Sequence, residues 1–108
     1  MARLQISKLT AELAGDVPNL VYNCFGYTCH RDWAYDQNYL LKLSQNPRNI
    51  VVVGTDENGR VRACMMCIQH HPDPALVALG PMWTDPSLSR VDGGLFFQDV
   101  GRMLNDYF

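Results

Sequence analysis

The sequence predicts an α+β domain, in which an antiparallel meander sheet of about four strands carries helices packed on it. Two observations lead to this prediction. Strand-like segments, which either alternate apolar and polar residues or form short apolar runs, are separated by clear turn signals. Their order along the chain is strand, helix, helix, three successive strands and helix, so the later strands have no room for parallel crossovers between them.

Size and composition fit one compact domain. The chain has 108 residues, of which 47% are apolar and 19% are charged, so residues 1–108 form a single domain with a core of their own. A net charge of −2 argues against a nucleic-acid-binding protein. No apolar run approaches the roughly 20 residues of a membrane helix, and the N-terminus lacks the apolar region of a secretory signal. We therefore expect a cytoplasmic protein that binds neither nucleic acid nor membrane.

The first half of the chain predicts one strand and two helical regions. Residues 3–9 alternate apolar and polar side chains, as in a half-buried strand. Thr10 is a candidate N-cap for a helix that reaches Phe25, although a glycine and a proline interrupt the pattern. A short turn followed by a second helix with Asp16 as its N-cap is the alternative. After an irregular aromatic segment, a further helix is expected over about residues 36–44.

The second half predicts three strands in succession. Residues 50–55 and 60–69 are joined by the turn "DENG", in which Asn58-Gly59 is a strong hairpin signal. The next strand covers residues 75–84 and contains Gly80-Pro81. Because proline lacks the amide hydrogen that a sheet ladder needs, we expect a bulge or a sheet edge at that point.

A last helix is expected to begin at Gly93 or Gly94. The first amides of a helix have no partner within it, and the helix dipole is positive at this end, so a helix start can bind a phosphate group. Arg90 stands nearby as a cation. A helix start with glycines is also consistent with ordinary capping, and this pattern alone does not decide between the two.

The cysteines raise a separate question. Cys64 and Cys67 form a C-x-x-C pair, and Cys24, Cys29, His30, His70 and His71 could be considered as further metal ligands. The pair lies in a predicted strand, where residues three apart point to opposite faces of the sheet. Zinc pairs of this spacing normally sit on a turn, so we expect buried free thiols in a reducing compartment rather than a metal site.

Several short motifs, taken in order, carry a resemblance to a known family. They are Tyr22-Asn23-Cys24-Phe25-Gly26-Tyr27-Thr28, Tyr35-Asp36, Asp56-Glu57-Asn58-Gly59 and Asp85-Pro86. Together they resemble the N-terminal two-thirds of the GNAT acyltransferase superfamily. The resemblance implies a GNAT-like fold that lacks the C-terminal strands, and it implies a function: binding acetyl-CoA or another acyl-CoA, with transfer of the acetyl group to an amine.

The resemblance also implies a cofactor-binding site in two segments. The backbone of Met82, Trp83 and Thr84 would pair with the pantetheine arm. The turn that follows would hold the pyrophosphate through Arg90, Val91, Asp92, Gly93, Gly94 and Leu95. The resemblance implies no particular catalytic residue. His70 and His71 are either a general base near the place that the thioester would occupy or an exposed loop pair.

Departures from the family pattern point to a second hypothesis. Leu95 stands where the family has glycine or alanine, and Asp92 places a negative charge in the predicted phosphate site. The family's later strands have no counterpart before Phe108, which would leave the edge of the last strand uncovered. We therefore expect a homodimer or the remainder of a longer chain to cover this edge. The alternative function is a non-catalytic GNAT-derived sensor or dimerisation module with a decayed cofactor site.

Overall fold

The computed structural model describes residues 4–26, 32–46, 49–68 and 78–105 of the chain. Along the chain the elements are β1 (Gln5–Lys8), α1 (Ala11–Ala14), α2 (Val17–Phe25), the 3₁₀ helix η1 (Asp32–Tyr35), α3 (Gln37–Gln45), β2 (Asn49–Thr55), β3 (Val61–Ile68), β4 (Ala78–Thr84) and α4 (Arg90–Asn105). The predicted order of strands and helices is confirmed. Positions 75–77 of the expected last strand lie outside the described residues.

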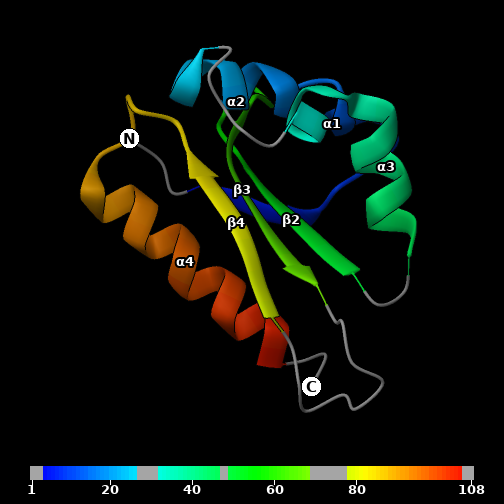
Figure 1. Ribbon diagram of the computed structural model, residues 1–108. Helices are drawn as coiled ribbons and strands as arrows, with labels where there is room; N and C mark the ends of the chain where they lie inside the picture. Colours follow the sequence, from blue (N-terminus) through cyan, green and yellow to red (C-terminus); the bar gives the residue numbers. More distant parts are fainter. Residues whose placement is uncertain (1–3, 27–31, 47–48, 69–77, 106–108) are drawn as a thin grey trace.

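The strands form one antiparallel sheet with the order β1-β2-β3-β4. Figure 1 shows α1, α2 and α3 on one face of this sheet and α4 on the other, with β4 at an edge beside α4. The predicted α+β class and four-stranded antiparallel sheet are therefore confirmed. None of the helices in the described ranges combines the length and the apolar character that a membrane span requires.

Each face of the sheet has its own apolar core. In β2, the side chains of Val51 and Val53 pack with the α1–α3 layer, whereas those of Ile50 and Val52 pack with α4. The alternation is the ordinary consequence of the pleat, which points successive side chains to opposite faces. A sheet covered on both faces has buried residues at nearly every position, which explains why β2 reads as a continuous apolar run.

The two cysteines of β3 follow the same alternation. Cys64 belongs to the core beneath α1–α3 and Cys67 to the core beneath α4, so the prediction that they face opposite sides is confirmed. Both are buried free thiols, and burial raises the pKa of Cys64 to about 12. Among the described residues, no group of histidines, cysteines and acidic residues has the arrangement of a metal site. Cys29, His30, His70 and His71 lie outside the described residues.

Local signals in the sequence account for most element boundaries. Asp36 caps α3, because its carboxylate accepts hydrogen bonds from the amides of Asn38 and Tyr39 at 3.0 and 3.2 Å. Gly59 has a φ of 76° in the β2–β3 turn, a conformation that favours glycine. The β3–β4 pairing shifts register between Met65 and Cys67, which confirms the bulge expected near the proline of β4.

The region before the first long helix contains a break. The structure has two helices, α1 and α2, so the alternative of a short turn followed by a second helix is the correct one. Asp16 occupies the N-cap position of α2, but its side chain makes no capping hydrogen bond. The carboxylate instead accepts hydrogen bonds from Arg60 Nη2 at 2.8 Å and from the amide of Val61 at 2.7 Å, which ties α2 to the start of β3.

Replacing Asp16 by asparagine should therefore lower stability in a pH-dependent way. Burial alone would raise the pKa of Asp16, but hydrogen bonds from Arg60, Asn19 and the Val61 amide, with the Arg60 charge, hold the pKa below its ordinary value. The resulting stabilisation is present above the unfolded-state pKa of roughly 3.9 and disappears as the pH falls through the lower folded-state value.

The expected loss of unfolding free energy near pH 7 is about 1 kcal/mol, because solvent screens a pair whose arginine is largely exposed. Urea unfolding of wild type and Asp16→Asn between pH 2.5 and 7 would measure it. The difference between the two proteins should shrink at the acid end. A difference that stays constant over this range would contradict the assignment.

Candidate functional site

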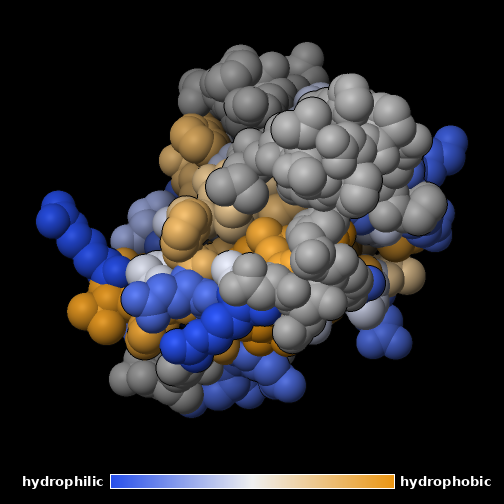
Figure 2. Space-filling view, turned by 90° about the horizontal axis from the view of Figure 1, so that it is seen from below, coloured by the Kyte–Doolittle hydropathy of each residue, from blue (hydrophilic) through white to orange (hydrophobic). Residues whose placement is uncertain are grey.

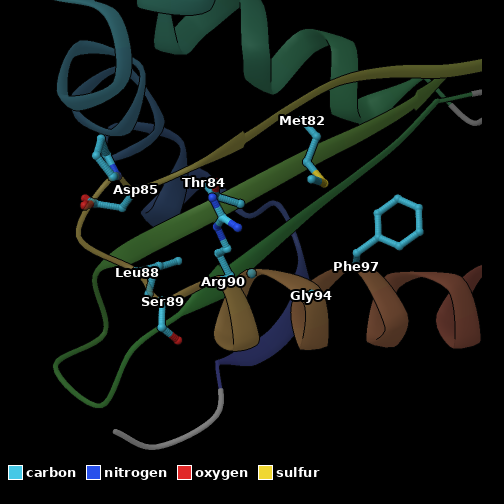
Figure 3. A pocket seen from close by; sticks show the side chains of 10 residues that line it. Met82, Thr84, Asp85, Leu88, Ser89, Arg90, Gly94 and Phe97 are labelled. Atoms are coloured by element: carbon cyan, nitrogen blue, oxygen red, sulfur yellow. The ribbon is translucent and has the colours of Figure 1, made fainter.

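A groove lies between the end of β4 and the first turns of α4. Its volume is about 430 Å³, and its lining combines glycines, apolar side chains and charged side chains. The lining residues are Met82, Thr84, Asp85, Pro86, Leu88, Ser89, Arg90, Gly93, Gly94 and Phe97. Figure 3 shows these residues arranged along β4, the connecting turn and the exposed start of α4.

The helix that forms one side of the groove starts earlier than the sequence suggested. We expected it to begin at Gly93 or Gly94, and this is wrong: α4 begins at Arg90. Ser89 caps it, because the Ser89 hydroxyl accepts a hydrogen bond from the Asp92 amide at 3.1 Å and the Ser89 carbonyl accepts one from the Gly93 amide at 3.1 Å. A serine cap compensates for the poor helix propensity of the glycines, which therefore lie inside the first turns.

The two glycines leave the groove open. A Cβ at Gly94 would meet nothing within 4 Å, and one at Gly93 would only reach Thr84 Cγ2 at 3.9 Å. Packing with the rest of the protein therefore does not require glycine at either position. Glycine costs about 1 kcal/mol relative to alanine inside a helix, so two consecutive glycines facing a groove favour close approach of another molecule.

The helix start also supplies positive charge. The amides of Arg90 and Val91 precede the capped amides, and within the described part of the chain neither has a hydrogen-bond partner. In Figure 3 the side chain of Arg90 extends from the first turn of α4 toward β4, and both Arg90 and Thr84 line the groove. Unpaired amides, the positive end of the helix dipole and a guanidinium make this part of the groove suitable for an anion.

One acidic residue lines the groove, but its charge is compensated. The Asp85 carboxylate accepts hydrogen bonds from the Ser87 amide at 2.9 Å and from Asn23 Nδ2 at 3.3 Å, and it lies 3.6 Å from Arg62 Nε. Burial alone would raise the pKa of Asp85, yet the bonds from Ser87 and Asn23 and the Arg62 charge lower it. The carboxylate is thus held ionised, with partners in its own turn, in α2 and in β3.

The structure brings together some of the residues predicted for the site and separates others. Met82, Thr84, Arg90, Gly93 and Gly94 line the groove, whereas Trp83, Val91, Asp92 and Leu95 are not among its lining residues. The side chain of Trp83 is buried on the other face of the sheet, where its ring centroid lies 6.2 Å from that of Trp33. The two departures from the family pattern, at Asp92 and Leu95, are therefore not part of the lining of the groove.

In the apolar part of the lining, Met82 was among the predicted site residues, whereas sequence reasoning missed Phe97. Phe97 and Met82 are 50% and 42% exposed although both are large and apolar. Phe97 follows Phe96, which is fully buried against the sheet, so the helical turn directs Phe97 away from the core. The "FF" pair at this spacing was the available signal, since one helix face cannot bury two adjacent residues equally.

The edge of β4 adjoins the groove. Within the described part of the chain, β4 pairs only with β3, which leaves its other edge without a strand partner. The thiol of Cys24 in α2 donates a hydrogen bond to the carbonyl of Thr84 at 3.2 Å and fixes the end of the strand. Seen from below, Figure 2 shows apolar surface in the middle of the molecule, with hydrophilic side chains projecting around it.

A second cavity of about 300 Å³ lies on the α2 side and is lined by Pro18, Asn19, Tyr22 and Tyr35. It shares no lining residue with the groove between β4 and α4. Its four lining residues include no charged side chain. The groove is therefore the stronger candidate for a functional site.

Comparison with solved structures identifies the fold. An aminoglycoside 6′-acetyltransferase type Ii superposes with a TM-score of 0.68 at 15% identity, over 95% of this chain and 63% of the other. An acetyltransferase from Trypanosoma brucei gives a TM-score of 0.68 at 11% identity, over 95% and 75%. A tetramutant of a Bacillus halodurans protein gives 0.70 at 15% identity, over 96% and 77%.

No protein-family model and no curated protein matches the sequence. At identities this low, the structural likeness shows the fold alone. The chain has a partial GNAT acetyltransferase fold, which confirms the resemblance found in the sequence. It spans between 63% and 77% of the length of the three structures named above.

Proposed function

We propose that the groove between β4 and α4 binds acyl-CoA, with acetyl-CoA as the simplest ligand, and that the protein transfers the acetyl group to an amine. The observation that carries this proposal is the start of α4, where two glycines without a packing role face an open groove beside Arg90. The fold of acetyltransferases supports the chemical class. Because one fold can host unrelated functions, the residues of the groove rather than the fold determine which ligand binds.

The parts of the groove match the parts of the ligand. The unpaired amides of Arg90 and Val91, together with the Arg90 guanidinium, would hold the pyrophosphate. The unpaired edge of β4 would offer backbone groups to the amides of the pantetheine arm, in the manner of an added strand. Met82, Leu88 and Phe97 would cover the apolar stretches of the same arm.

The proposed reaction is direct transfer. A neutral amine attacks the thioester carbonyl carbon, and a C–N bond forms. The C–S bond then breaks, and the proton released by the amine is transferred to the departing thiolate, so coenzyme A leaves as the thiol. The strand edge would orient the thioester carbonyl toward the acceptor.

Arg90→Ala should weaken CoA binding. Loss of a charge-assisted hydrogen bond to a phosphate lowers affinity by roughly tenfold or more. Arg102→Ala is the matched control, because Arg102 lies in the last turn of the same helix and is 75% exposed. Isothermal titration calorimetry with CoA should show a loss of affinity for Arg90→Ala but not for Arg102→Ala. Equal affinities for both variants and wild type would argue against a pyrophosphate at this helix start.

The second candidate is a non-catalytic GNAT-derived sensor or dimerisation module. It was suggested by Asp92 and Leu95, and neither residue lines the groove. Titration and turnover together separate the two functions. CoA binding with acetyl-CoA consumption in the presence of a panel of amines supports the transferase, whereas binding with no consumption favours the module.

We further propose that the protein is a homodimer in which a second copy pairs with the part of the β4 edge that precedes Met82. An exposed strand edge readily pairs with another chain, and the residues of β4 that line the groove are Met82 and Thr84, so the partner and the pantetheine arm would use different parts of the edge. Light scattering at micromolar concentration should give twice the mass of the chain. A monomer over the whole accessible concentration range would contradict this part of the proposal.

A further inference from the structure

We propose that Arg62, which lies outside the groove, is a positioning residue that fixes the turn between β4 and α4 in the shape that binds the anionic ligand. This inference rests on the function proposed above, since it concerns the same groove. Arg62 is not a lining residue, so it would act through Asp85 and Ser87 rather than by touching the ligand.

The Arg62 guanidinium joins two turns of the fold. Its Nη1 lies 3.3 Å from Asp56 Oδ2 in the β2–β3 turn, and its Nε lies 3.6 Å from Asp85 Oδ2 after β4. Its Nη2 donates a hydrogen bond to the hydroxyl of Ser87. Every nitrogen of the planar group therefore has its own partner. The side chains are also well shielded, with 21% exposure for Arg62 and 12% for each of the two aspartates.

The contacts of Arg62 set the course of the chain into α4. The Asp85 amide donates a hydrogen bond to the Arg62 carbonyl at 2.8 Å. Arg62 therefore contacts Asp85 through its backbone as well as through its side chain. Asp85 in turn accepts from the Ser87 amide and hydroxyl at 2.9 and 2.7 Å, and its carbonyl accepts from the Leu88 amide at 2.9 Å. Ser89, the residue after Leu88, caps α4, so this turn fixes the position of the helix start and of its amides.

Arg62 also controls charge at the groove. Asp85 lines the groove, and without a cationic partner its carboxylate would repel the phosphates that the helix start attracts. A lysine could supply the charge but not three separate donors in one plane. Both the shape of the turn and the neutralisation of Asp85 thus depend on an arginine at this position.

The experiment compares Arg62→Gln with Arg60→Gln as a matched control. Arg60 lies two residues away, pairs with Asp16 at the start of α2, and is not a lining residue of the groove. Two quantities are measured: the dissociation constant for CoA by calorimetry, and amide hydrogen exchange of the peptide covering residues 85–92 without ligand. Exchange reports the order of the turn whether or not CoA binds.

We expect Arg62→Gln to weaken CoA binding by about fivefold to tenfold and to speed exchange of residues 85–92 by roughly threefold to tenfold. Arg60→Gln should change neither. Ser87→Ala, which removes one partner of Arg62 at an exposed position, should give a smaller change in the same direction and covers the case in which Arg62→Gln does not fold.

The outcomes separate this inference from the proposed function. If wild type does not bind CoA, the proposed function fails, and exchange alone decides the role of Arg62. Unchanged exchange in Arg62→Gln and Ser87→Ala would overturn the positioning role. So would equal losses of affinity in Arg62→Gln and Arg60→Gln, because that result would reflect general destabilisation.

Discussion

Gly94→Glu should abolish measurable CoA binding while leaving the protein at least as stable as wild type. The position lines the groove, and a Cβ there would meet nothing within 4 Å, so the side chain enters open space that the ligand would otherwise fill. The carboxylate adds repulsion to the blockage. We expect affinity for CoA to fall by about 100-fold or more. Stability should rise, because glutamate favours helix and lies near the positive end of α4.

Gly101→Glu is the control for this substitution. It makes the same change in the same helix, at an exposed position where a Cβ also meets nothing within 4 Å, about 10 Å further along the axis. This variant should keep its CoA affinity. Calorimetry and thermal unfolding of both variants measure the two effects. Retained binding in Gly94→Glu, or equal losses in both variants, would show that CoA does not approach α4 at Gly94.

Gly54→Ala should cause the largest loss of stability, about 2–3 kcal/mol of unfolding free energy. Gly54 lies in β2 directly beneath α4. A Cβ there would lie 2.8 Å from Phe96 Cδ1 and 3.1 Å from Leu4 Cδ1. Both neighbours are buried, so neither can move into solvent to relieve the clash. Alanine normally makes a strand slightly more stable than glycine does, but this stabilisation is smaller than the cost of the overpacking.

A double variant identifies the clash. Phe96→Leu removes the ring, so Gly54→Ala should cost much less in that background than in wild type. Gly101→Ala is the positive control and should stabilise α4 by roughly 0.5–1 kcal/mol. Urea unfolding gives the free energies of wild type, the two single variants, the double variant and the control. If Gly54→Ala were as stable as wild type, α4 could not pack on β2 through Phe96.

Much of the fold could be predicted because its signals are local. The Asn58-Gly59 turn and the proline of β4 each act within a few residues, and each has the predicted consequence. The opposite directions of Cys64 and Cys67 follow from the strand pleat alone. Features of this kind need no knowledge of tertiary contacts.

The start of α4 could not be placed so well. Two glycines indicate a helix boundary because of their low propensity, but the Ser89 cap and the burial of Phe96 and Val100 keep them within the helix. Tertiary packing outweighed a local preference. Both glycines line the groove, and they do so from inside the helix rather than at its first residue.

The Arg62 contacts lay beyond sequence reasoning altogether. Arg62 lies in β3, Asp56 in the turn between β2 and β3, and Asp85 and Ser87 in the turn after β4. These residues meet only because β3 pairs with both of its neighbours. The fragment "DPS" after the last strand, an Asp with Ser two residues on, was the one local signal for this turn. It indicates a structured connection but not the arginine that holds it.

Two-dimensional NMR of the ¹⁵N-labelled protein during a CoA titration tests the central claim most directly. Binding in the groove predicts saturable shifts of the amides of Met82 to Thr84 and Arg90 to Gly94, with little change in α1 and α3. Shifts confined to the α1–α3 face, or none at millimolar CoA with the protein folded, would contradict the assignment of this groove as an acyl-CoA site.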